Sequence, residues 1–158
     1  MFGTPQSEHN WLDQLVGDWK AVSECEMPGG KKEQTEGTMS CRSVGGLWLV
    51  GEGTGESAEQ GSWSSIMTLG FDPARERYVG NFIASVMTHQ WLYEGTVNEE
   101  GNILALDTEG PKFTGDGTAR YQDRIEIVND DHWVMSSHML GDDGNWQQIM
   151  RADHHRKS

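Results

Sequence analysis

Cysteine is scarce in this chain of 158 residues, which contains only Cys25 and Cys41. Two cysteines cannot form the disulfide framework of a small secreted domain. If the chain turns near residues 28–30, Cys25 opposes a residue close to Glu36, and Cys41 lies too far along the partner strand for a bond. We therefore expect two reduced cysteines that act as small core residues.

Basic residues are also few. The 12 lysines and arginines stand against 25 aspartates and glutamates, which gives a formal charge of −13. Such a surface repels phosphate groups, and this excludes nucleic acids and anionic membranes as partners. The simplest interpretation of the acidic excess is solubility.

Long apolar runs are missing as well. Runs such as residues 47–50 are far too short to cross a bilayer. Residues 1–5 do not show the basic region followed by an apolar stretch that marks a secretory signal. The sequence therefore predicts a protein of the cytoplasm.

Helical periodicity is confined to one segment near the N-terminus. Apolar residues at helical spacing predict a short helix over residues 7–16, with Ser7 as its cap and Gly17 as its end. About three turns can cover or plug another structure but cannot form a helical layer.

From residue 18 onward, short alternating segments are separated by turn residues, which is typical of a sandwich or a barrel. The short connections leave no room for the crossovers that parallel strands need, and a meander loses its exposed edges by closing. We predict a single all-β domain in which an antiparallel meander of about ten strands closes into a barrel over residues 18–153, followed by a frayed tail at 154–158. The expected strands are 18–27, 33–44, 47–55, 62–71, 77–84, 88–97, 102–109, 118–128, 132–140 and 145–153.

Turn positions set the register of each hairpin and therefore the face on which a side chain lies. A two-residue turn at 100–101 places Val97 opposite Leu104 on an apolar face that should point inward. A turn at 130–131 places Asp123 opposite His138, and a turn at 143–144 places Arg151 beside Ser136. Rings, methionines and isolated polar groups on the inner face are typical of a small-molecule cavity. The predicted ligand-binding residues are His89, Trp91, Tyr93, Thr108, Tyr121, Asp123, Ser136 and His138.

A short motif resembles the signature of the lipocalins and their calycin relatives. Gly17-Asp18-Trp19, which follows the short helix and opens the first strand, is similar to the Gly-x-Trp motif of those barrels. The resemblance implies a lipocalin-like barrel in which Trp19 packs at the closed end beneath an arginine from a late strand. Arg151 matches that role in this sequence.

A longer resemblance extends over most of the chain. The sequence is similar to an uncharacterised bacterial family of the calycin superfamily, domain of unknown function fifteen seventy-nine. This resemblance implies the barrel and brings no settled activity. There are two departures from the lipocalins, the missing secretory signal and the missing disulfide. The segments that carry the resemblance are residues 67–74, 87–91, 108–111, 121–123 and 137–139.

The inward residues allow more than one kind of chemistry. Asp123 and His138 could form an acid–base pair, or a buried pair that holds two strands in register, which Arg151 could complete. We predict no cofactor and no metal, although zinc or haem iron at His89, His138 and Asp123 remains an alternative. His154 and His155 do not suggest a metal pair, because adjacent strand residues point to opposite faces.

Three functions follow from these features. We favour a barrel that binds a small, partly apolar molecule over an enzyme, because no nucleophile is implied by the spacing of residues. The first alternative is an enzyme that uses Asp123 and His138 in the same pocket. The second is a structural module that forms a homo-oligomer through exposed rings such as Trp133 or Trp146. The sequence does not name the ligand.

Overall fold

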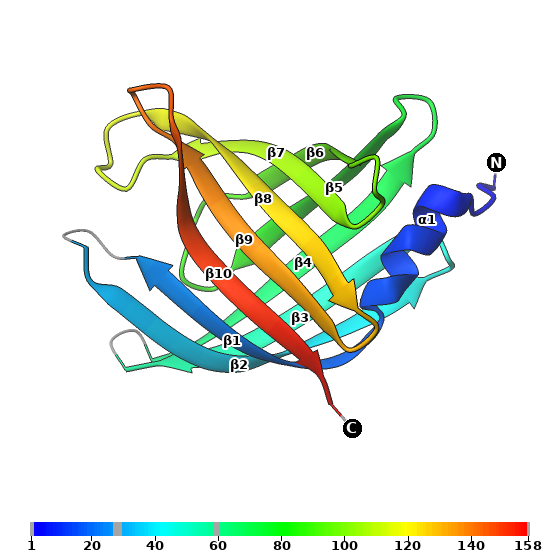
Figure 1. Ribbon diagram of the computed structural model, residues 1–158, viewed down its shortest axis with the longest axis horizontal. Helices are drawn as coiled ribbons and strands as arrows, with labels where there is room; N and C mark the ends of the chain where they lie inside the picture. Colours follow the sequence, from blue (N-terminus) through cyan, green and yellow to red (C-terminus); the bar gives the residue numbers. More distant parts are fainter. Residues whose placement is uncertain (1, 27–29, 59–60, 158) are drawn as a thin grey trace.

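The computed structural model describes residues 2–26, 30–58 and 61–157. One short helix precedes ten strands (Figure 1). The elements are α1 (Ser7–Leu12), the 3₁₀ turn η1 (Asp13–Leu15), β1 (Gly17–Glu26), β2 (Lys32–Val44), β3 (Trp48–Ser57), β4 (Gly61–Asp72), β5 (Arg77–Ala84), β6 (Trp91–Val97), β7 (Ile103–Pro111), β8 (Thr118–Asn129), β9 (His132–Leu140) and β10 (Trp146–Arg156).

The ten strands form one closed antiparallel barrel. Each strand pairs with the next along the chain, and β1 closes the barrel by pairing with β10. Trp19 on β1 lies opposite Arg156 on β10, so the first and the last strands of the barrel are joined at this level. This confirms the predicted all-β barrel with one short N-terminal helix.

Glycines permit the tight coiling of the strands at three positions on the inner face. A Cβ atom on Gly37, Gly80 or Gly95 would lie 2.1, 2.0 or 1.8 Å from a carbonyl oxygen of the neighbouring strand. No side chain fits at such distances. Glycine is therefore required where these strands bend, as in other small barrels.

Packed side chains close the end of the barrel next to α1, which lies at the right in Figure 1. Leu15, Trp19, Leu104 and Trp133 are at most 1% exposed. The Trp19 and Trp133 rings meet edge to face at 6.0 Å, and the Trp19 indole N–H donates to the Leu15 carbonyl at 2.8 Å. The helix end and the first strand are thus joined through one buried tryptophan.

The arginine above Trp19 is Arg156 and not Arg151. The Arg156 guanidinium lies 4.2 Å from the centre of the Trp19 ring and donates to the Val16 and Asp130 carbonyls. Arg151 is exposed and binds Asp153 instead. The prediction was wrong because β10 is longer than expected and reaches Arg156, so residues 154–156 are not a frayed tail. Residue 158 lies outside the described residues.

The helical segment is shorter than predicted. The α-helix ends at Leu12 and gives way to a 3₁₀ turn before Gly17 opens β1. Its cap is Gln6 and not Ser7, and the backbone N–H of Gln6 donates to Nδ1 of His9 at 2.9 Å. In the described part of the chain, no helix has the length and apolar character needed to cross a membrane.

Both cysteines are free, as predicted. Cys25 lies opposite Glu33 near one end of the β1–β2 pair, whereas Cys41 lies opposite Gly17 at the other end. Burial raises the pKa of the Cys41 thiol to about 12, so this thiol stays protonated and inert near neutral pH.

Candidate functional site

The β6–β7 hairpin places its side chains as the sequence predicts. Gly95 lies opposite Leu106 and Val97 opposite Leu104 in the β6–β7 pair. In the β4–β5 pair, Phe71 lies opposite Tyr78. The inner face of these strands therefore follows from their turns, as expected for hairpins without a bulge.

The β8–β9 hairpin is shifted by one residue relative to the prediction. A bulge between Ile127 and Asn129 places Asp123 opposite Ser137, whereas His138 lies opposite Gln122. Because side chains alternate between faces, the extra residue turns His138 to the outer face of the barrel. The predicted pair of Asp123 and His138 therefore does not form.

Ser136 and Arg151, which were both predicted to face inward, also lie on the outer face. The Ser136 hydroxyl lies 3.0 Å from Nε2 of His138, and both residues face away from the barrel interior. Arg151 is paired with Ser136, as the last hairpin predicts, but on this outer face. Trp133, expected to be exposed, is buried inside, whereas Trp146 is exposed.

Three inward side chains form a cluster inside the barrel, which we call the interior acid cluster: Tyr93, Asp123 and Ser137. The Tyr93 hydroxyl donates to Oδ2 of Asp123, and the Ser137 side chain also hydrogen-bonds to this carboxyl. Tyr93 comes from β6, Asp123 from β8 and Ser137 from β9. The cluster thus ties together three strands at one level of the barrel.

Burial controls the protonation of this cluster. Desolvation raises the pKa of Asp123 above its ordinary value of 3.8, although the bonds from Ser137 and Tyr93 favour the carboxylate. Desolvation and the neighbouring carboxyl together raise the pKa of Tyr93 well above its ordinary value. None of the groups that shift the pKa of Asp123 is a cation. A buried acid without a cationic partner is costly unless another group compensates for it.

An aromatic wall adjoins the cluster. The Trp91 ring meets Tyr121 edge to face at 4.9 Å, and His89 meets Trp91 at 4.7 Å. A Cβ on Gly110 would lie 2.2 Å from the Trp91 ring, so the glycine leaves room for the indole. His89 precedes β6 rather than lying within it, and its Nε2 is 2.9 Å from the Glu109 carbonyl. These rings give the inner surface a flat apolar side.

Thr108 supplies a further polar atom on this inner surface. Its side chain is buried, and its hydroxyl has no hydrogen-bond partner among the described residues. A hydroxyl that is buried and unpaired is uncommon in folded proteins. The Thr108 hydroxyl is therefore a buried polar atom of the inner wall whose hydrogen-bonding capacity is unused.

The end of the barrel away from α1, which we call the open end, is lined by inward residues that retain partly exposed surface. Asp123 and Ser137 within the interior acid cluster are also partly exposed. The β7–β8 and β9–β10 connections border this end (Figure 1). The partly exposed residues near the opening are Cys25, Thr35, Trp63, Ala84, Ala119 and Met139.

The outer surface also carries two depressions. One, of about 940 Å³, lies over β2, β3 and β4 and is lined mainly by short polar side chains. The other, of about 410 Å³, lies between the N-terminal residues and the β3 and β4 strands, beside His9 and Phe71. Neither is lined by a residue of the interior acid cluster.

The family of the chain follows from its sequence. Residues 4–156 match the model of the family described as "Protein of unknown function (DUF1579)". The chain belongs to the DUF1579 family. This confirms the resemblance found in the sequence. No curated protein matches the sequence significantly.

Solved structures resemble this DUF1579 barrel in fold. An S-type phycobiliprotein lyase from Guillardia theta aligns with a TM-score of 0.68 at 16% identity, over 96% of this chain and 93% of its own. The protein Rv2717c from M. tuberculosis aligns with a TM-score of 0.67 at 16% identity, over 98% of this chain and 100% of its own. At these identities the comparisons establish the lipocalin-like fold alone.

Sequence reasoning missed two residues of this DUF1579 barrel, each for its own reason. Ser137 was missed because the bulge before β9 shifts the register, and Arg156 because β10 continues past its expected end. A signal for the bulge was present at residues 129–131. The Asn129 side chain accepts the Asp131 amide at 2.9 Å, an Asx turn that the Asn-Asp-Asp sequence allows.

The raised pKa of Asp123 makes stability depend on pH. Because the pKa of Asp123 is higher in the folded than in the unfolded protein, the folded protein keeps this proton to a higher pH. The free energy of unfolding therefore falls as the pH rises through the folded pKa. Relative to Asp123→Asn, the wild type should lose stability as the pH rises from about 4, the ordinary aspartate range, to neutrality. Urea unfolding of both proteins across this range measures the difference. A difference that stays constant, or that changes in the opposite direction, would contradict the desolvation of Asp123.

Proposed function

We propose that the barrel binds a small, partly apolar molecule through its open end. The interior acid cluster anchors a polar group of the ligand, while Trp91 and Tyr121 contact its flat apolar part. One observation carries this proposal. The Asp123 carboxyl group is desolvated inside the barrel, yet the residue keeps some exposed surface, and no cation is among the groups that shift its pKa.

The charge and bonding of the cluster indicate the chemistry of the ligand. Asp123 is held by two hydroxyl groups, from Tyr93 and Ser137, and neither neutralises a carboxylate. A ligand that brings an amine or a hydroxyl donor compensates for the buried acid. The ligand class is therefore a flat apolar molecule with a hydrogen-bond donor.

Native mass spectrometry of freshly purified protein tests this function. We expect a non-covalent excess mass that disappears on denaturation. Ala119 points inward at the open end beside Gly110, and Ala119→Trp should fill the opening and abolish the excess mass. Thr118→Trp is the matched control, because Thr118 is the preceding residue and is exposed on the outer face.

Two results would contradict the proposal. One is an excess mass that is equal in the Ala119→Trp and Thr118→Trp variants, since the bound molecule would then lie elsewhere. The other is a clean apo mass for the wild type combined with no binding of an added apolar probe. Thermal unfolding of both variants shows whether each one is folded.

A further inference from the structure

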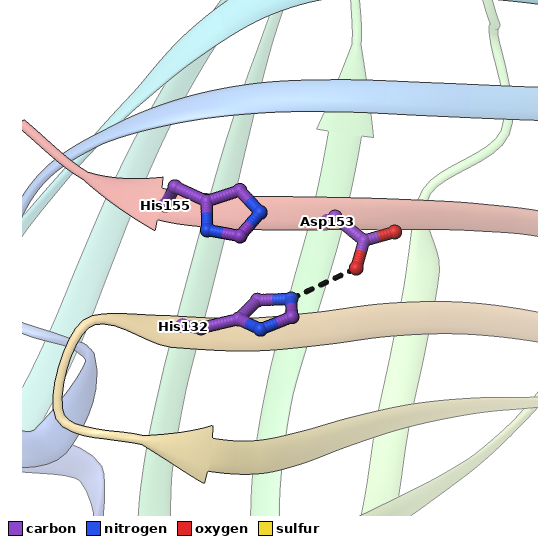
Figure 2. Close-up of side chains that lie close together, drawn as sticks. All are labelled: His132, Asp153 and His155. Carbon is purple, nitrogen blue, oxygen red and sulfur yellow. Dashed lines mark hydrogen bonds and ion pairs between the residues drawn. The ribbon is translucent and has the colours of Figure 1, made fainter.

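A second polar cluster lies outside the barrel, where β9 and β10 pair near the closed end. His132 on β9 is directly opposite His155 on β10, and Asp153 lies two residues before His155 on the same face of β10. Figure 2 shows the three side chains next to one another on these neighbouring strands. One ligand atom from each residue lies within 4.8 Å of the others.

The pleat of β10 explains why these side chains face outward together. His154 points into the barrel, where it is buried and stacks on Trp133 at 3.7 Å. Its neighbours Asp153 and His155 therefore point outward. The cluster is separate from the interior acid cluster and does not depend on any ligand in the barrel.

The present contacts already bring the donor atoms together. Nε2 of His132 donates to Oδ1 of Asp153 at 2.8 Å, and the His132 and His155 rings stack at 4.2 Å. His155 is exposed, so its ring can rotate to turn a nitrogen toward the other two groups.

We propose that His132, Asp153 and His155 form a surface site for a divalent transition-metal ion such as Zn²⁺. Two imidazoles and one carboxylate are a donor set that Zn²⁺ and its neighbours in the first transition row accept, with water in the remaining positions. Mg²⁺ and Ca²⁺ prefer oxygen donors and bind such a set weakly.

Arg151 limits the affinity of this site. Its Nε and Nη2 atoms lie 3.0 and 3.2 Å from the two oxygens of Asp153, so its positive charge competes with the metal for the carboxylate. Glu126 is the acidic group that acts on Arg151 besides Asp153. Removal of Arg151 should therefore strengthen metal binding. If the three residues formed only a structural ion-pair network, removal of Arg151 would not increase the affinity for a metal.

Zn²⁺ titration by isothermal calorimetry tests the proposal on the full chain. We expect one ion per chain, and a loss of affinity of about tenfold or more in His155→Ala and in Asp153→Asn, since loss of a direct ligand should cost at least as much as loss of an outer-shell partner. Asp131→Asn is the matched control: Asp131 is a nearby exposed acid that pairs with Arg156 and is not a ligand. Excess Mg²⁺ should not displace the Zn²⁺.

A second variant and a second readout separate a metal site from general attraction to an acidic surface. Arg151→Gln should bind Zn²⁺ more tightly than the wild type, and bound Co²⁺ should give visible absorption that His155→Ala loses. Equal Zn²⁺ binding by the wild type and His155→Ala would overturn the proposal. So would an equal loss in Asp131→Asn, or no measurable binding by either the wild type or Arg151→Gln.

Discussion

Replacement of Trp19 by alanine should lower the free energy of unfolding by about 3–5 kcal/mol, the usual cost of removing a fully buried large aromatic side chain. The Trp19 indole packs against Trp133, donates to the Leu15 carbonyl and carries the Arg156 guanidinium on its face. The variant loses all of these contacts and leaves a cavity at the closed end. For a domain of this size, the midpoint of thermal unfolding should fall by roughly 6–20 °C.

Trp146→Ala is the matched control for this measurement. Trp146 is 44% exposed, whereas Trp19 is 1% exposed. The control should therefore change the free energy of unfolding by no more than about 1 kcal/mol. Equal losses in the two variants, measured by urea or thermal unfolding, would show that the closed end is not packed around Trp19.

Gly95→Ala should destabilise the barrel by about 3 kcal/mol or more, at or beyond the upper end of the usual cost of overpacking. The added Cβ would lie 1.8 Å from the carbonyl oxygen of Ala105 and 3.0 Å from the Cα of Leu106. Both are backbone atoms of β7, so no side-chain rotation relieves the clash. The β6–β7 pair has to move apart, and this breaks the register between Gly95 and Leu106.

Thr96→Ala is the control for Gly95→Ala. Thr96 is the next residue of the same strand, and its side chain is exposed on the outer face. Its replacement should cost about 1 kcal/mol or less, the span of strand propensities. Chemical denaturation compares the two variants directly. If Gly95→Ala is as stable as Thr96→Ala, then the strands do not approach each other as closely as the barrel requires.

The fold could be predicted from the sequence because strand alternation and turn residues are local signals. The ten strand segments lie close to their predicted bounds, and the β6–β7 register followed from the turn before Asn102. Barrel closure followed from the number of strands and their short connections. The motif around Trp19 gave the closed end correctly, with Arg156 in place of Arg151.

The candidate site was predicted only in part, because a shift of one residue in the β8–β9 register changes which side chains face the interior. The bulge at Ile127 to Asn129 exchanged His138 for Ser137 as the neighbour of Asp123. The predicted residues on β6, β7 and the inner face of β8 do not depend on this hairpin, and they lie inside the barrel. The surface cluster of His132, Asp153 and His155 could not be predicted from the sequence, because it joins two strands and depends on the register of β9 against β10.

Titration with Nile red, an uncharged apolar dye whose fluorescence rises in apolar surroundings, tests most directly whether the open end of the barrel admits a small molecule. We predict saturable fluorescence for the wild type and for Thr118→Trp, whose new ring lies on the outer face, and none for Ala119→Trp, whose ring fills the opening. Equal dye binding by Ala119→Trp and the wild type, or no binding by the wild type, would contradict a ligand site inside the barrel.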